Sequence, residues 1–101
     1  MKKTVAIFSK NLRTSLAFFE ELIGNMLYRD IVRISKNPGR CYVETVDETI
    51  YKVVPANVAV RGSRFTDAYI LEGVEQAFID GVIMPSLVPH DDGSEPTITY
   101  F

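Results

Sequence analysis

The residues whose types and spacing suggest chemistry lie in one short segment in the middle of the chain. Arg61 and Arg64 enclose a Gly-Ser pair, and Asp67 and Glu72 enclose the short apolar run that follows. Two guanidinium groups so close together can clamp a phosphate, because each offers a planar fork of hydrogen-bond donors. A simpler interpretation, which we favour, gives the glycine a turn with positive φ and pairs Arg64 with Asp67 or Glu72. The segment therefore predicts either a phosphate contact or a structural turn.

Two other sets of residues have catalytic or metal-binding side chains. His90, Asp91 and Asp92 are metal-ligand types, yet three adjacent residues do not readily converge on one ion, and we expect a solvated loop. Ser9 stands about eighty residues from the single histidine and gives no indication of a catalytic triad. The sequence thus predicts no catalytic residue, no metal site and no cofactor.

Length and composition favour one soluble domain. The chain has 101 residues, of which 47% are hydrophobic, and we expect a single α/β domain over residues 1–101. No apolar run approaches the roughly 20 residues that a membrane span requires, so we expect no membrane partner. Cys41 has no second cysteine with which to form an intrachain disulfide, and we expect it to be buried or half-buried in a strand. These features predict a cytoplasmic protein.

Charge is distributed unevenly along the chain. Residues 1–40 carry eight Lys or Arg and three Asp or Glu, and residues 41–101 carry three and ten, so the halves are +5 and −7 and sum to −2. This asymmetry indicates either a basic face for an acidic partner or, as we favour, halves that attract each other within one fold or charges that are spread over the surface. The acidic total and the lack of aromatic residues among the lysines weigh against nucleic acid.

The start of the chain predicts a buried strand followed by a long helix. Residues 4–8 form an apolar run without alternation, which is typical of a strand buried on both faces. Asn11 is placed to cap a helix, and apolar residues recur at helical spacing from Leu12 to Met26. Gly24 would end this helix in the left-handed conformation or lie inside its last turn.

The remaining segments predict a small sheet with a second, shorter helix. Residues 29–35, 40–46 and 49–54 are extended segments separated by turn residues, which indicates an antiparallel hairpin or meander. The elements expected after them are a short strand at 67–71, a helix at 74–83 weakened by Gly81, a polar loop at 85–96 and a last edge strand at 97–101. The fold class predicted is α/β, with a mixed sheet of about five or six strands. The last strand could pair with a partner's sheet edge or with a second copy as a homodimer.

Two segments resemble parts of a known family. One is the apolar strand and helix from Val5 to Leu22, and the other is Arg-Gly-Ser-Arg-Phe-Thr-Asp with the apolar run after it, at residues 61–73. They resemble the core of phage terminases and related helicase-like P-loop ATPases, over roughly residues 4–85 of the chain. The resemblance implies a P-loop-NTPase-like fragment whose Walker B strand runs toward Glu72. It also implies that the loop at the start of the first helix lies near nucleic acid, where Lys10 and Arg13 could contact phosphates.

The departures from that family predict a protein that does not hydrolyse nucleotides. The chain contains no G-x-x-x-x-G-K-[ST] loop to hold a phosphate. By the resemblance, Glu72 takes the place of the Mg²⁺-supporting Asp, and Gly73 takes the place of the Glu that positions water. Asp67 and Glu72 therefore mark a degenerate Walker B strand. Without the loop, its lysine and the base, positioning and charge neutralisation of the phosphates are lost, and we expect no enzymatic activity.

Three functions remain as hypotheses. The first is a non-catalytic protein-interaction module of phage or prophage origin, in the cytoplasm of the host cell, acting on a protein partner. The second is an accessory nucleic-acid-binding protein that uses the basic N-terminal half, with Lys10, Arg13, Arg61 and Arg64 as speculative contacts. The third is a nucleotide-binding protein that uses Arg61, Arg64 and Glu72 in trans with the phosphate loop of another chain.

Overall fold

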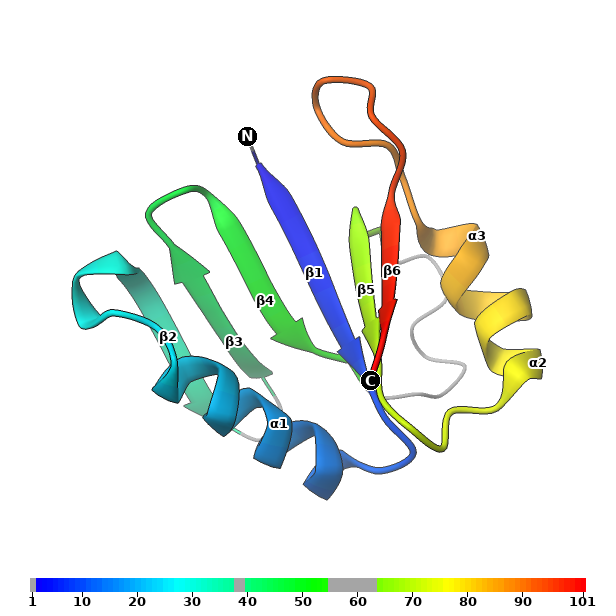
Figure 1. Cartoon of the computed structure of the whole chain (residues 1–101), viewed down its shortest axis with the longest axis horizontal. Coiled ribbons are helices and arrows are strands. Elements are labelled where there is room, and N and C mark those ends of the chain that lie inside the picture. Colours follow the sequence, from blue (N-terminus) through cyan, green and yellow to red (C-terminus); the bar gives the residue numbers. More distant parts are fainter. Residues whose placement is uncertain (1, 38–39, 55–63) are drawn as a thin grey trace.

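Six strands form one mixed sheet with helices on both of its faces (Figure 1). The structure is a computed structural model that describes residues 2–37, 40–54 and 64–101. The strand order is β2-β3-β4-β1-β5-β6. The predicted α/β class and the number of strands are confirmed. The break expected at residues 55–57 and the side chain of Arg61 lie outside the described residues.

The parallel part of the sheet is built around the first strand. β1 (Lys3–Phe8) pairs in parallel with β4 (Thr49–Val53) on one side and with β5 (Asp67–Ile70) on the other. β6 (Thr97–Tyr100) pairs in parallel with β5 and is the last strand on that side. The prediction of a doubly buried strand is confirmed, because β1 is covered by helices on both faces and residues 5–8 are buried.

The other end of the sheet is antiparallel, as the alternating sequence predicted. β2 (Ile31–Asn37) pairs with β3 (Arg40–Thr45), and β3 pairs with β4. A bulge at Val32 interrupts the β2–β3 pairing, since Ile31 faces Thr45 while Arg33 already faces Glu44. Cys41 is buried in β3, which confirms its predicted place in a strand.

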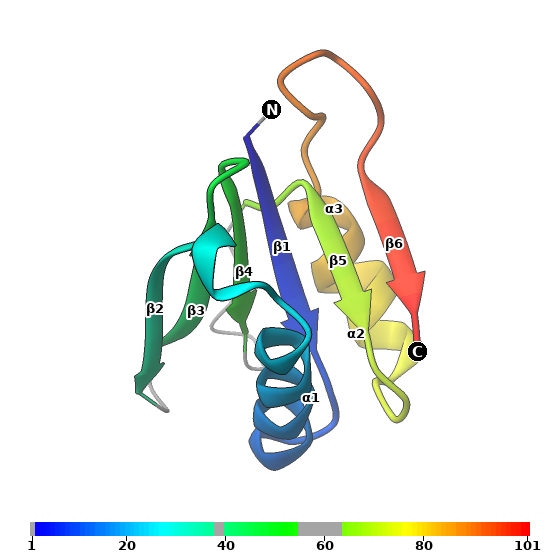
Figure 2. The same cartoon turned by 60° about the vertical axis from the view of Figure 1, so that its left-hand side comes forward.

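The first helix, α1 (Leu12–Gly24), covers one face of the sheet (Figure 2). The Asn11 side chain accepts a hydrogen bond from the Thr14 backbone N–H at 2.9 Å, so the predicted cap is confirmed. Phe19 and the half-buried apolar residues beside it pack on Ile7 and Val43 of the sheet. The helix has 13 residues, an ordinary length rather than the long helix expected.

A second helical region covers the opposite face (Figure 2). It comprises α2 (Gln76–Phe78), a π-helical turn η3 (Ile79–Ile83) and α3 (Met84–Ser86) without interruption. Ile79, Val82 and Ile83 are buried in it against a core that includes Phe8 and Phe65. The prediction of a polar loop from Pro85 is therefore wrong at its start. The helical run continues through Pro85 directly after the π-helical turn, where the Met84 N–H bonds to the Ile79 carbonyl and the regular i→i−4 ladder is already interrupted. No helix in the described ranges is long and apolar enough to cross a membrane.

Candidate functional site

The structure separates the residues that the sequence suggested as one site. Lys10 and Arg13 follow β1 at the carboxyl end of the parallel strands, and both are exposed. Arg64 precedes β5 and therefore lies toward the opposite end of the sheet. Asp67 begins β5, whereas Glu72 comes after the strand has ended. Arg64 and Glu72 thus lie beyond opposite ends of β5 and do not form one described site for a nucleotide.

A hollow of about 320 Å³ lies where β1 and β5 end. Its lining includes Ser9 and Lys10 from the first connection and Gly73 and Glu75 from the second. The chain leaves β1 for α1 on one face and leaves β5 for α2 on the other, which is where α/β sheets commonly bind ligands. Gly73 has φ of +97°, and a Cβ there would lie 2.7 Å from Cδ of Lys10. The glycine therefore lets the lysine stem cross the hollow at close range.

The polar groups at the base of this hollow are engaged within the protein. Ser9 is buried, its hydroxyl donates to the Asn11 carbonyl, and its oxygen lies 2.5 Å from the Ser15 hydroxyl oxygen. The Lys10 ammonium shares the site with the Glu75 carboxylate, which opposes the binding of an anion. The contacts in this hollow therefore indicate a role in holding the start of α1 more clearly than they indicate a ligand-binding site.

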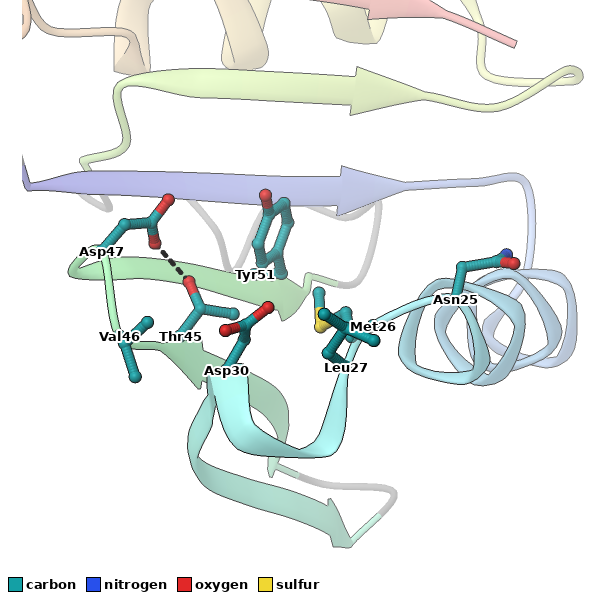
Figure 3. A pocket seen from close by; sticks show the side chains of 8 residues that line it. All are labelled: Asn25, Met26, Leu27, Asp30, Thr45, Val46, Asp47 and Tyr51. Carbon is teal, nitrogen blue, oxygen red and sulfur yellow. Dashed lines mark hydrogen bonds between the residues drawn. The ribbon is translucent and has the colours of Figure 1, made fainter.

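A second hollow, of about 450 Å³, lies at the antiparallel end of the sheet (Figure 3). Asn25, Asp30, Thr45, Asp47 and Tyr51 contribute its polar side chains. The Thr45 hydroxyl donates to Asp47 and is the main cause that lowers the pKa of that carboxyl, while burial raises the pKa of the Tyr51 phenol. Two carboxylates are present, but the described part of the chain contains no group of three or more metal-ligand side chains. The hollow is open and has the character of a surface depression.

A buried polar network fixes the start of β5 to the connection that leads into β6. His90 Nε2 lies 3.0 and 3.1 Å from the two carboxylate oxygens of Asp67, and His90 Nδ1 lies 2.9 Å from the Ser94 hydroxyl. The Thr97 backbone N–H donates to Asp67 at 3.2 Å, and the Thr66 hydroxyl donates to it at 2.9 Å. The expectation that His90 lies in a solvated loop is therefore wrong, because its ring is buried beside Asp67.

The electrostatics of this network favour the ionised form of Asp67. Burial acts to raise the pKa of the carboxyl, but hydrogen bonds from Thr97, Thr66 and His90 outweigh it and hold that pKa below its usual value. No buried side-chain nitrogen or oxygen in the described residues lacks a partner. The ring nitrogens of His90 and the carboxylate of Asp67 are thus occupied, and the network anchors the sheet rather than presenting a reactive group.

The outer edge of β6 presents backbone groups that can bind another strand. The Phe101 N–H donates to the Ile70 carbonyl at 3.0 Å, and the Thr97 N–H points to Asp67 on the same side. Successive N–H groups of a strand point to alternate sides, so those of Ile98 and Tyr100 point away from β5. No strand in the described ranges lies beyond β6 (Figure 2). The edge therefore offers backbone donors and acceptors to another strand.

Two aromatic residues adjoin the β6 edge. Tyr100 and Phe101 are 62% and 56% exposed, although the Phe101 ring also makes edge-on contacts with Phe18 and Tyr69, with ring centroids 4.9 and 5.2 Å apart. The sequence predicted the strand and its edge position, and both are confirmed. Its parallel pairing with β5 was not predictable from local pattern, and neither was the network that holds its first residue.

The fold and the site define a mixed α/β protein with an open parallel edge. A scan against protein-family models found no matching family, and searches of curated proteins and of solved structures found no match. The resemblance to terminases and helicase-like ATPases therefore stays a prediction.

Proposed function

We propose that the protein is a non-catalytic interaction module whose β6 edge accepts an extended strand from a protein partner. The observation that carries this proposal is the uncharged, unbulged outer side of β6, where the backbone groups of Ile98 and Tyr100 point outward. A strand added there gains main-chain hydrogen bonds, and pockets for alternate side chains give selectivity.

Edge protection distinguishes β6 from the opposite edge. Natural proteins shield edge strands with bulges and charged side chains because an unshielded edge pairs with other chains. β2 has both devices, with a bulge at Val32 and charges at Arg33 and Lys36, whereas the segment Thr-Ile-Thr-Tyr of β6 has neither. The short length of β6, four residues, limits how long a strand can pair with it, but no charge or bulge blocks that strand, which fits a binding role.

The proposal is tested by selecting short random peptides on the immobilised protein and measuring how their affinity depends on one backbone N–H. Tyr100→Pro removes that outward N–H, and proline is compatible with an edge strand. Tyr100→Ala keeps the N–H and removes only the side chain. We expect Tyr100→Pro to weaken the selected peptides by about tenfold or more, and Tyr100→Ala to weaken them clearly less. Peptides that bind the proline variant as tightly as the wild type would overturn the proposal.

A second candidate function is nucleic-acid binding at the β2 end of the molecule. Four exposed basic residues lie on η1 (Tyr28–Asp30), β2 and β3, namely Arg29, Arg33, Lys36 and Arg40. They form a basic edge larger than the pair Lys10 and Arg13, although Lys36 is already 3.4 Å from Glu20. Phosphate contacts of this kind weaken steeply as salt rises.

The test of this candidate is a titration of the ¹⁵N-labelled protein with short single- and double-stranded DNA at low and moderate salt. Shifts along β2 that disappear at moderate salt and in Arg33→Gln/Arg40→Gln would support it. An unchanged spectrum at low salt would exclude a nucleic-acid role for this edge.

A further inference from the structure

We propose that the strand accepted at the β6 edge is basic, with Lys or Arg at alternate positions. This inference rests on the proposed function and specifies the class of its partner. It is carried by the charge around the edge, by the open aromatic side chains beside it and by the poor fit of a second copy.

The C-terminal part of the chain is uniformly acidic. From Phe65 to Phe101 the sequence contains seven Asp or Glu and no Lys or Arg. One of the seven, Asp67, is buried with His90, and the other six are exposed. They are Glu72, Glu75, Asp80, Asp91, Asp92 and Glu95. This segment builds β5, the second helical region and β6, so the open edge belongs to the acidic part of the fold.

The exposed acids lie before and after the edge strand in space. Asp91, Asp92 and Glu95 belong to the connection that leads into β6, drawn in orange in Figure 1. Glu72 follows Leu71 just beyond the other end, where the Phe101 N–H bonds to the Ile70 carbonyl. A strand laid along β6 therefore passes carboxylates at both of its ends. At the Glu72 end the stem of Lys10 lies against Gly73, so the end near the orange connection is the more acidic. Positive side chains on that strand gain from the field of these groups, and negative ones are repelled.

Tyr100 adds a second attraction for a cation. Its ring is 62% exposed at the end of β6, on the same side of the strand as Ile98. An Arg or Lys on the neighbouring strand can place its charged group over such a ring. The aromatic and acidic groups thus favour the same chemistry in the partner.

A second copy of the chain fits this edge poorly. Two β6 edges paired about a two-fold axis would bring the acidic connection of each copy to the end of β6 of the other, near its Glu72, and like charges would meet. Pairing β6 with the basic β2 of another copy would match charge. It would also meet the bulge at Val32, and it would continue from copy to copy without closing. A basic strand of a different protein meets neither obstacle.

The experiment compares two synthetic peptides of equal length, in which Thr and Val alternate with either Lys or Gln. Affinities for the full chain are measured by fluorescence anisotropy at about 50 and 300 mM NaCl, where the screening of exposed charges differs clearly. We expect the Lys peptide to bind about tenfold more tightly at low salt and to lose most of that preference at high salt. Tyr100→Pro should weaken both peptides.

Matched variants locate the source of the preference. Glu72→Gln/Asp91→Asn/Glu95→Gln removes three carboxylates around β6, and Glu21→Gln/Glu44→Gln/Glu48→Gln removes three from the other half of the sequence. We expect the first triple variant to lose most of the preference for the Lys peptide and the second to keep it. Both variants should retain the wild-type circular dichroism spectrum, since none of these six side chains is buried.

The outcomes separate the partner's chemistry from the proposed function. Equal binding of both peptides, sensitive to Tyr100→Pro, would overturn the basic partner and leave the edge as a strand acceptor. Self-association in sedimentation equilibrium that Tyr100→Pro abolishes would overturn it in favour of a second copy. Binding of neither of these two peptides, together with a failed peptide selection, would overturn the proposed function itself.

Discussion

The two edges of the sheet differ in protection, in charge and in how they are held. β2 is bulged, carries Arg33 and Lys36, and is tied to α1 by an exposed ion pair between Lys36 and Glu20 at 3.4 Å. β6 is short and uncharged, and its first residue is tied to the core through the buried Asp67–His90 pair. One edge is thus shielded from other strands, while the other is firmly placed and left open.

The uneven charge of the sequence is also distributed unevenly across the sheet. The four basic residues between positions 29 and 40 lie toward the β2 edge, and the segment without Lys or Arg builds β5 and β6. The asymmetry therefore runs from one edge of the sheet to the other. The β2 half also carries acids, such as Glu44 opposite Arg33, so the acidic β6 edge is the one whose charge can orient a positively charged partner before contact.

The largest expected effect comes from removing the anchor of the open edge. Asp67→Ala leaves His90 and Thr97 without their buried acceptor, and a buried donor left unsatisfied in this way costs about 1–3 kcal/mol. Lys36→Ala breaks the exposed pair at the other edge and should cost about 0.5 kcal/mol or less. Urea unfolding followed by circular dichroism measures both changes in unfolding free energy. Equal losses of unfolding free energy in the two variants would show that both edges are held equally firmly and would contradict the comparison.

A related effect concerns acid. The pKa of Asp67 is lower in the folded chain than in the unfolded chain, so the unfolded chain binds a proton at this carboxyl more readily. The contribution of Asp67 to the unfolding free energy is therefore complete above the unfolded pKa of about 3.9. That contribution is lost as the pH falls through the folded-state pKa. We expect Asp67→Asn to flatten the fall of unfolding free energy in this range, measured by urea unfolding at a series of pH values.

Asp47→Asn is the matched control for the acid experiment. The Thr45 hydroxyl also lowers the pKa of Asp47, but that carboxyl lies at the surface of the antiparallel end, where solvent screens it. Asp47→Asn should change the pH dependence of the unfolding free energy less than Asp67→Asn does. An identical acid profile for Asp67→Asn and the wild type would contradict the assigned role of the buried carboxylate.

The smallest effect is expected from removing the charges that shield β2. Arg33→Thr/Lys36→Thr leaves the bulge at Val32 in place, so its edge becomes only partly like that of β6. We expect a modest increase in dimer, relative to the wild type, in sedimentation velocity at high protein concentration. Lys2→Thr/Arg13→Thr removes two exposed charges elsewhere and should not produce it. The same increase in both variants would point to net charge instead of edge protection.

Local pattern predicted those elements that local forces determine. The apolar run at 4–8, the Asn11 cap and the alternation of the antiparallel strands each follow from short-range preferences, and each is present. Proline commonly ends a helix, so local pattern predicts an end before Pro85, whereas the helical run continues through this proline after the π-helical turn. The helical turns before Pro85 are buried against Phe8 and Phe65, which is a tertiary effect.

The candidate site was less predictable than the fold. Asp67 and His90 are separated by 23 positions, and nothing in their spacing indicates that parallel pairing of β5 and β6 brings them together. The sequence around His90 predicted a solvated loop, whereas the His90 ring is buried and bonds to Asp67. The usable signal lay elsewhere, in an uncharged β-rich segment at the end of a long stretch without Lys or Arg. Only the sheet order showed that this segment forms an open edge.

The most direct test of the open edge is an NMR titration of the ¹⁵N-labelled protein with the peptide in which Thr and Val alternate with Lys. We expect the backbone amides of Ile98 and Tyr100 to shift most, with those of Arg33 and Lys36 on β2 unchanged. Shifts centred on β2, or around Ser9 and Gly73 with β6 silent, would contradict the account and place the binding surface elsewhere.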